Sequence, residues 1–194
     1  MNSSDTINIH AVIPSSRVNG PGRRMVVFFQ GCGRNCPGCF NPETHSDAGG
    51  LIKTPQQVFD ESLTKGIEGL TVSGGEPFEQ PDGLTALVRL ARTRYGLTTV
   101  VYTGFTIEEL QKDPQRGSAL QYIDVLIDGP YKEGMKETTL LARGSTNQRL
   151  IFLSNRYQLA DFYMPGKAEL TISSEGVVTG TGFGRCVGPP RASF

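Results

Sequence analysis

Residues 25–39, MVVFFQGCGRNCPGC, join a short apolar segment directly to a loop of glycine and cysteine. The apolar part has the length and the β-branched and aromatic content of a buried strand. Further short apolar segments, mostly followed by Gly, Ser or Asp, lie at residues 70–72, 98–102, 125–127 and 150–153. Strands that end in glycine-rich loops are typical of parallel sheets, which bind their ligands at the carboxyl ends of the strands.

Helical patterns alternate with these predicted strands. Thr54 and Gln57 have the spacing of a capping box and predict a helix over residues 55–65, ended by Gly66. Thr106 and Glu109 have the same spacing and predict the start of a later helix. Between them, apolar residues recur at helical intervals before Gly96; they are Leu84, Leu87, Val88 and Ala91. Repeated strand, helix and strand indicate right-handed βαβ units, so the fold class is expected to be α/β with one parallel sheet.

The sequence changes character after residue 155. Residues 169–173 and 176–180 alternate around Ser174-Glu175-Gly176, which predicts a β-hairpin. We therefore expect a core domain over residues 1–155 and a C-terminal extension with a hairpin over residues 156–194.

Composition narrows the class of partner. The chain has 194 residues, 37% of them hydrophobic, and a formal net charge of +0. Without a cluster of basic residues, it is not expected to bind nucleic acid or a membrane surface. It also lacks the apolar run of about 18 to 20 residues that spans a bilayer. The N-terminal residues do not have the pattern of a secretory signal, so a cytoplasmic location is expected.

Three of the four cysteines lie within eight residues, with the spacing Cys32-x3-Cys36-x2-Cys39. A disulfide framework is not expected in a cytosolic chain of this size, and inert packed cysteines would not gather on a polar loop. A Cys3His zinc site that includes His45 is chemically reasonable. The other alternative is an iron-sulfur cluster, whose cubane form normally has four thiolate ligands.

A cluster with three cysteine ligands leaves one iron without a protein ligand, which suits a catalytic centre. Gly31, Gly33 and Gly38 would let the loop wrap around a bulky cluster. Cys186 lies about 150 residues away in the sequence and is expected to be a free or buried thiol.

The cysteine spacing, followed by Ser73-Gly74-Gly75-Glu76-Pro77 at the end of the second predicted strand, resembles the radical S-adenosylmethionine (radical SAM) superfamily. A narrower resemblance, over roughly residues 7 to 155, is to the activating proteins of anaerobic ribonucleotide reductase, which are glycyl-radical enzyme activases. The shared segments occur in the same order in both; they are VNGPG at 18–22, CPGCFN at 36–41, YTG at 102–104, IDG at 127–129 and RGSTNQ at 143–148.

This resemblance implies an incomplete (β/α) barrel of radical SAM type that binds a 4Fe-4S cluster and S-adenosylmethionine (SAM). By position, Cys32, Cys36 and Cys39 would ligate the cluster. The methionine amino group of SAM would bind at Ser73, Gly74, Gly75 and Glu76, and the adenine near Phe40 and Asn41. Phe40 could equally be a core residue, and Thr103 and Ser145 are further candidate ligand contacts.

The resemblance also implies a reaction and its partners. An electron donor such as flavodoxin or ferredoxin would reduce the cluster, SAM would be cleaved to a 5'-deoxyadenosyl radical, and a glycine of the reductase would become a radical. One alternative is a radical SAM enzyme that modifies a peptide or small molecule with a helper protein. A second is a metal-binding interaction module without SAM chemistry, which would release no 5'-deoxyadenosine from SAM.

Overall fold

The computed structural model describes residues 6–164, 168–172 and 178–182. Its main sheet has seven strands in the order β3-β1-β2-β4-β5-β6-β7. These are β1 (Ile7–Ser16), β2 (Arg24–Phe29), β3 (Leu51–Lys53), β4 (Gly69–Gly74), β5 (Thr98–Tyr102), β6 (Val125–Asp128) and β7 (Arg149–Phe152). The four central strands β2, β4, β5 and β6 are parallel. β1 and β3 at one edge and β7 at the other are added antiparallel.

Helices connect the parallel strands. The α-helices of the described residues are α1 (Pro55–Ser62), α2 (Pro81–Thr93), α3 (Ile107–Lys112) and α4 (Pro114–Gly117). Short 3-10 turns are η2 (Pro42–Thr44), η3 (Pro77–Glu79), η4 (Leu120–Tyr122), η5 (Glu133–Met135) and η6 (Leu159–Phe162). The capping boxes predicted at Thr54 and Thr106 are both confirmed, and they begin α1 and α3. α1 ends at Ser62, before the predicted stop at Gly66.

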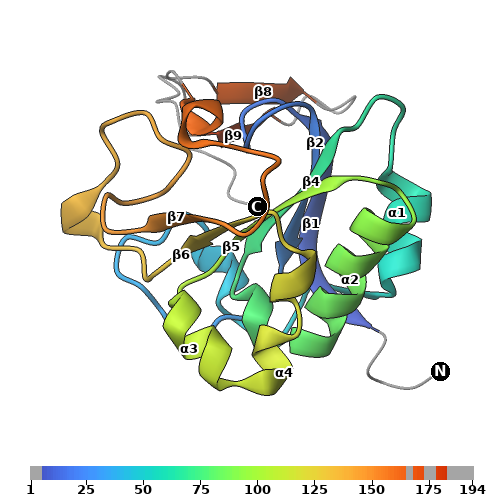
Figure 1. Cartoon of the computed structure of the whole chain (residues 1–194), viewed down its shortest axis with the longest axis horizontal. Coiled ribbons are helices and arrows are strands. Elements are labelled where there is room, and N and C mark those ends of the chain that lie inside the picture. Colours follow the sequence, from blue (N-terminus) through green and yellow to red (C-terminus); the bar gives the residue numbers. More distant parts are fainter. Residues whose placement is uncertain (1–5, 165–167, 173–177, 183–194) are drawn as a thin grey trace.

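The two faces of the sheet have different partners. Alternate strand residues such as Met25, Val27 and Leu70 join the main core with α1, α2 and α3, which lie on one side of the sheet (Figure 1). Residues of the opposite register, such as Val100 and Ile127, form a second cluster with Leu141, Ala142, Phe162 and Met164. The loop between β6 and β7 and the segment after β7 therefore both pack on the face that the helices leave open.

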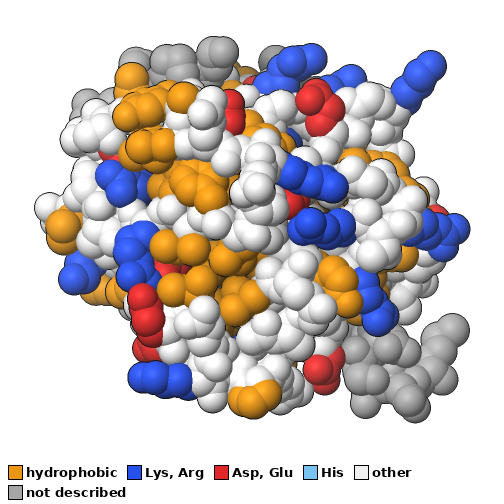
Figure 2. All heavy atoms as spheres, in the orientation of Figure 1, with side chains coloured by type: hydrophobic (Ala, Val, Ile, Leu, Met, Phe, Trp, Pro, Cys, Tyr) orange, Lys and Arg blue, Asp and Glu red, His pale blue; other side chains and the backbone are white. Residues whose placement is uncertain are grey.

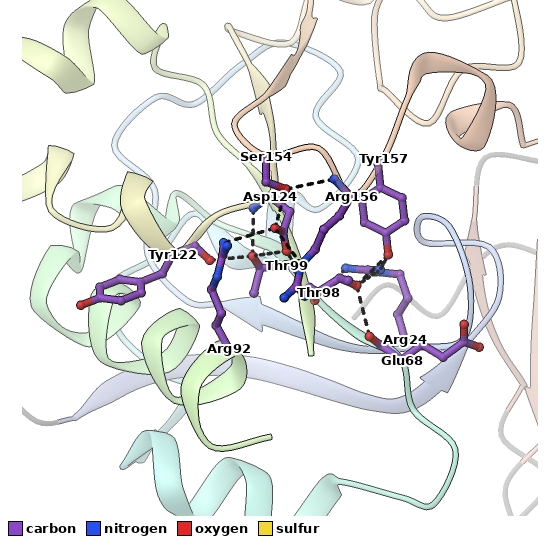
Figure 3. A network of polar contacts seen from close by, with 10 residues as sticks. All are labelled: Arg24, Glu68, Arg92, Thr98, Thr99, Tyr122, Asp124, Ser154, Arg156 and Tyr157. Carbon is purple, nitrogen blue, oxygen red and sulfur yellow. Dashed lines mark hydrogen bonds and ion pairs between the residues drawn. The ribbon is translucent and has the colours of Figure 1, made fainter. Parts of the chain in front are cut away.

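Buried polar side chains attach the segment after β7 to the sheet (Figure 3). Arg24 and Asp124 are both 0% exposed. Arg24 donates hydrogen bonds to Tyr157 Oη at 3.0 Å and to the carbonyl of Leu70 at 2.7 Å. Asp124 accepts one from Ser154 Oγ at 2.6 Å. Burial lowers the pKa of Arg24, and its contact with Tyr157 opposes that fall.

The α/β class is as predicted, but the sheet is mixed and not wholly parallel. Residues 150–153 were expected to form another parallel strand, whereas β7 runs antiparallel to β6. The reason is the connection between them, which contains only the short turn η5 in place of a crossover helix. β1 and β3 were not predicted. The open, mixed sheet does not itself show a radical SAM barrel.

The predicted C-terminal hairpin is present as β8 (Ala168–Ile172) paired antiparallel with β9 (Val178–Gly182). Its second strand begins two residues later than expected, and the predicted turn at 174–176 and Cys186 lie outside the described residues. Tyr157 and Phe162 already pack with the sheet, whereas the predicted domain boundary at 155 stays a prediction.

The surface in Figure 2 carries acidic and basic side chains interspersed with hydrophobic atoms, in keeping with the net charge of +0. Among the described residues, no helix is both long and apolar enough to span a membrane.

Candidate metal centre and ligand cavity

The cysteine loop leaves β2 and closes on itself at its base. Gly31 N donates a hydrogen bond to the carbonyl of Thr44 at 2.9 Å, and Cys32 N donates one to the carbonyl of His45 at 3.1 Å. Gly31 has φ +100° and Gly38 has φ +66°, conformations that glycine adopts without strain. The loop therefore turns sharply at both points and keeps all three cysteines between its two ends.

The three thiols border one cavity and are partly buried and free. Burial raises the pKa of both the Cys32 and the Cys39 thiol, so the site by itself favours the neutral form. Bound metal cations reverse this preference, because a coordinating thiol is deprotonated. The backbone N-H of Asn41 lies 3.4 Å from Cys39 Sγ and stabilises negative charge there. The three thiols, with this N-H donor beside one of them, fit an iron-sulfur cluster.

A zinc ion needs all of its ligands on one atom, whereas a cubane cluster spreads its thiolate ligands over several irons. Within the described ranges, no three His, Cys, Asp or Glu side chains are grouped closely enough to hold a metal ion. His45 does border the cavity, and its Nε2 is buried without a hydrogen-bond partner.

The cavity has a volume of about 250 Å³ and extends along the face of the sheet opposite the helices. It runs from the cysteine loop, past Ser73 on β4 and Tyr102 on β5, to Asn19 and strand β9. The three cysteines line it together with residues of the segments that carry the family resemblance and with His45; besides the cysteines these are Asn19, Phe40, Asn41, His45, Ser73, Gly74, Gly75, Glu76, Tyr102, Thr103, Gly104, Gly129, Gly144 and Gln148.

Gly74 and Gly75 are required by the chain's own packing. A Cβ on Gly74 would lie 2.4 Å from the backbone nitrogen of Phe29, and one on Gly75 would lie 2.2 Å from the carbonyl oxygen of Gly31. Gly75 N also donates to the carbonyl of Phe29 at 2.8 Å, and Glu76 N to that of Gly31 at 2.9 Å. The end of β4 thus lies directly against the start of the cysteine loop, and both border the cavity.

The Glu76 carboxylate ties three motifs together. It is 2% exposed and accepts hydrogen bonds from Phe78 N at 3.1 Å, Thr103 Oγ1 at 2.8 Å and Gly104 N at 2.7 Å. Arg34 of the cysteine loop lies 3.5 Å from its Oε2. Burial raises the pKa of Glu76, and these donors oppose that rise. Since a carboxylate has about four lone-pair positions, a ligand ammonium would have to displace one donor, and Arg34 is the most distant.

The remaining predicted ligand contacts differ in position. Phe40 is 41% exposed, so it is not a core residue, and its ring packs against Tyr131 with centroids 5.0 Å apart. Ser73 borders the cavity. Ser145 does not border it, since this fully buried residue accepts a hydrogen bond from Lys132 N at 3.2 Å. Its place in the structure is in the packing of the loop between β6 and β7.

Other cavity residues were not singled out as ligand contacts. They include Arg34, Glu43, Tyr131, Gln148 and Thr181. Arg34 was the most accessible to sequence reasoning, because it lies between two of the cysteines. Tyr131 and Thr181 carried no signal, because only the fold brings these distant segments to the cysteine loop and Asn19.

Comparison with known proteins agrees with this site. Residues 18–151 match the family described as "4Fe-4S single cluster domain", which spans the cysteine loop and ends before β8. The chain thus has the fold and the cysteine site of a single-cluster iron-sulfur protein.

Its relatives carry a more specific name, anaerobic ribonucleoside-triphosphate reductase-activating protein. The relative from Enterobacteria phage T4 is 35% identical over 150 residues, which is 74% of this chain and 93% of the relative. That from Pasteurella multocida is 34% identical over 152 residues, covering 74% and 96%. That from Escherichia coli K12 is 33% identical over 150 residues, covering 73% and 96%. The chain belongs to this family of reductase-activating proteins.

Proposed function

We propose that this chain is a radical SAM enzyme that generates a glycyl radical on an anaerobic ribonucleotide reductase. The observation that carries the proposal is the meeting of two segments at one cavity: the cysteine loop and the turn from Ser73 to Glu76. The relatives, which are named for activating this reductase, support the choice of partner.

Cys32, Cys36 and Cys39 would hold three irons of a 4Fe-4S cluster and leave the fourth for SAM. When bound and reduced by a donor such as flavodoxin or ferredoxin, the cluster supplies one electron that breaks a C-S bond of the sulfonium. The products are methionine and a 5'-deoxyadenosyl radical, which takes a hydrogen atom from a glycine Cα and becomes 5'-deoxyadenosine. The unpaired electron therefore ends on the partner's glycine.

The chain's own residues would bind and orient SAM. The exposed ring of Phe40, supported by Tyr131, offers a surface for the adenine. Ser73 and the backbone at Gly74 border the space next to the cysteine loop, where the methionine end would lie. Glu76 would act mainly by fixing the cysteine loop to Thr103 and Gly104, because its oxygens already accept several hydrogen bonds.

The cavity also has to protect a reactive radical from solvent. The cavity lies on the face of the sheet that carries no helices, and the segment after β7 covers part of that face. We propose that the reductase completes the enclosure. A cytoplasmic location, where thiols stay reduced, would suit both the cluster and this partner.

The test is to incubate the anaerobically reconstituted, reduced protein with SAM and the reductase from the same cell. We expect 5'-deoxyadenosine and a glycyl-radical doublet by electron paramagnetic resonance. If a peptide or metabolite is consumed and no doublet forms, that molecule and not the reductase is the substrate. Absence of 5'-deoxyadenosine with every substrate would contradict radical SAM chemistry itself.

A further inference from the structure

One wall of the cavity is built by strand β9, which lies beyond the family match that ends at residue 151. Gly180, Thr181 and Gly182 border the cavity consecutively. Because two of the three residues have no side chain, this wall consists largely of backbone. Figure 1 shows the hairpin at the top of the view, beside the blue segment that leads into β2.

Specific hydrogen bonds hold this wall in place. Asn19 Nδ2 donates to Thr181 Oγ1 at 2.9 Å, and Thr181 Oγ1 lies 3.3 Å from Asn19 Oδ1, to which it donates. On the neighbouring strand, Glu169 Oε1 accepts from Arg17 N at 2.9 Å. Both strands of the hairpin are thus attached to the segment before β2.

The anchor is itself connected to the buried centre of the protein. Asn19 Nδ2 also donates to Ser16 Oγ at 2.8 Å, and its carbonyl accepts from Thr71 Oγ1 at 2.7 Å. Thr71 Oγ1 in turn accepts from Arg24 Nε at 2.8 Å. A chain of hydrogen bonds therefore fixes the position of Thr181 relative to β2 and β4.

The hairpin has a strand edge with which no other strand of the described chain pairs. Its sheet has only two strands, β8 and β9, so within the described residues one edge of β9 has no strand partner. An unpaired edge offers backbone N-H and C=O groups to an added strand. Glycines on that edge allow another backbone to approach closely.

We propose that β9 is the docking edge for the polypeptide substrate, which binds in extended form along residues 180–182. This inference rests on the proposed function, because it takes the substrate to be a protein segment that must enter the cavity. Thr181 and Asn19 are positioning residues: they fix the edge at one end of the cavity, while the cysteine loop lies at the other. The occupant that we assign to this glycine-containing edge is an extended polypeptide backbone.

The first test measures binding and needs no turnover. Amide hydrogen exchange of the reconstituted protein is followed alone, with SAM, and with the reductase. We expect the reductase to slow exchange in residues 178–182 and SAM alone to leave it unchanged. Protection by SAM alone would assign β9 to the SAM site, and no protection by the reductase would exclude docking there; either result overturns the proposal.

The second test separates binding from chemistry. Thr181→Val keeps the shape of the side chain and removes its hydrogen bonds to Asn19; Thr64→Val, at an exposed position away from the cavity, is the matched control. We expect Thr181→Val to raise the KM for the reductase about threefold to tenfold, the effect of one or two hydrogen bonds. SAM affinity and iron content should match those of the control.

A rise in the SAM Kd with an unchanged KM for the reductase would contradict the proposal, as would no change in either. Gly180→Val, which adds a side chain to the wall, should raise the same KM further. These outcomes are distinct from failure of the proposed function, which would show as absence of 5'-deoxyadenosine in the unmodified protein.

Discussion

Gly75→Ala is expected to destabilise the cysteine loop even when no ligand is bound. The new Cβ would lie 2.2 Å from the carbonyl oxygen of Gly31, 2.8 Å from its carbonyl carbon and 3.1 Å from the carbonyl oxygen of Thr44. All of these are backbone atoms, so no side-chain rotation relieves the clash. Inserting one methyl group into a packed site costs about 1–3 kcal/mol, and we expect the upper part of that range.

The assay is chemical unfolding of the cluster-free protein together with iron content after anaerobic reconstitution. Gly134→Ala is the matched control, because a Cβ there meets no atom within 4 Å. The control should change stability by less than about 1 kcal/mol and keep full iron content. If Gly75→Ala matches the control in both measurements and loses only SAM binding, then Gly75 serves the ligand and our packing argument is wrong.

The remaining predictions concern buried charge and the cysteines. Arg24→Met should lower the free energy of unfolding by about 3 kcal/mol or more in chemical denaturation, because several buried acceptors lose their donor, whereas exposed Arg89→Met should stay within about 0.5 kcal/mol. Glu76→Gln should be most destabilising near pH 4 in unfolding curves. Burial raises the pKa of Glu76 above its ordinary value of 4.5, so the stability that its neutral form contributes is lost as pH rises through the folded-state pKa. A difference in the free energy of unfolding between the two proteins that stays constant from pH 4 to 8 would contradict this. Cys39→Ala should lose the cluster, measured as iron per chain, and Cys186→Ala should retain it; loss in both would indicate a fourth protein ligand.

Local sequence patterns predicted the parallel centre of the fold because their causes are local. The capping boxes at Thr54 and Thr106 form as expected, and the apolar segments lie in β2, β4, β5, β6 and β7. β7 runs antiparallel to β6 because of the connection between them. The residues of the strand itself do not indicate its direction. β1 had a usable signal in the alternation of Ile7, Ile9 and Ile13, although a histidine and an asparagine between them weakened it.

The candidate site divides in the same way. The rule that parallel strands gather their loops at one edge correctly brings Ser73 to Glu76 beside the cysteines. The packing of Gly75 on Gly31 and the arrival of Thr181 at Asn19 depend on contacts between distant segments. Sequence spacing alone does not encode such contacts. For the same reason the sequence did not show that Ser145 is buried in the loop between β6 and β7 and does not line the cavity.

The most direct test of the central claim is the electron paramagnetic resonance spectrum of the reduced cluster with and without SAM. In the proposed site, Cys32, Cys36 and Cys39 would leave one iron without a protein ligand, so we expect SAM to change the spectrum of a centre that contains about four irons per chain. Stoichiometric zinc, or a four-iron spectrum that SAM leaves unchanged, would contradict the account.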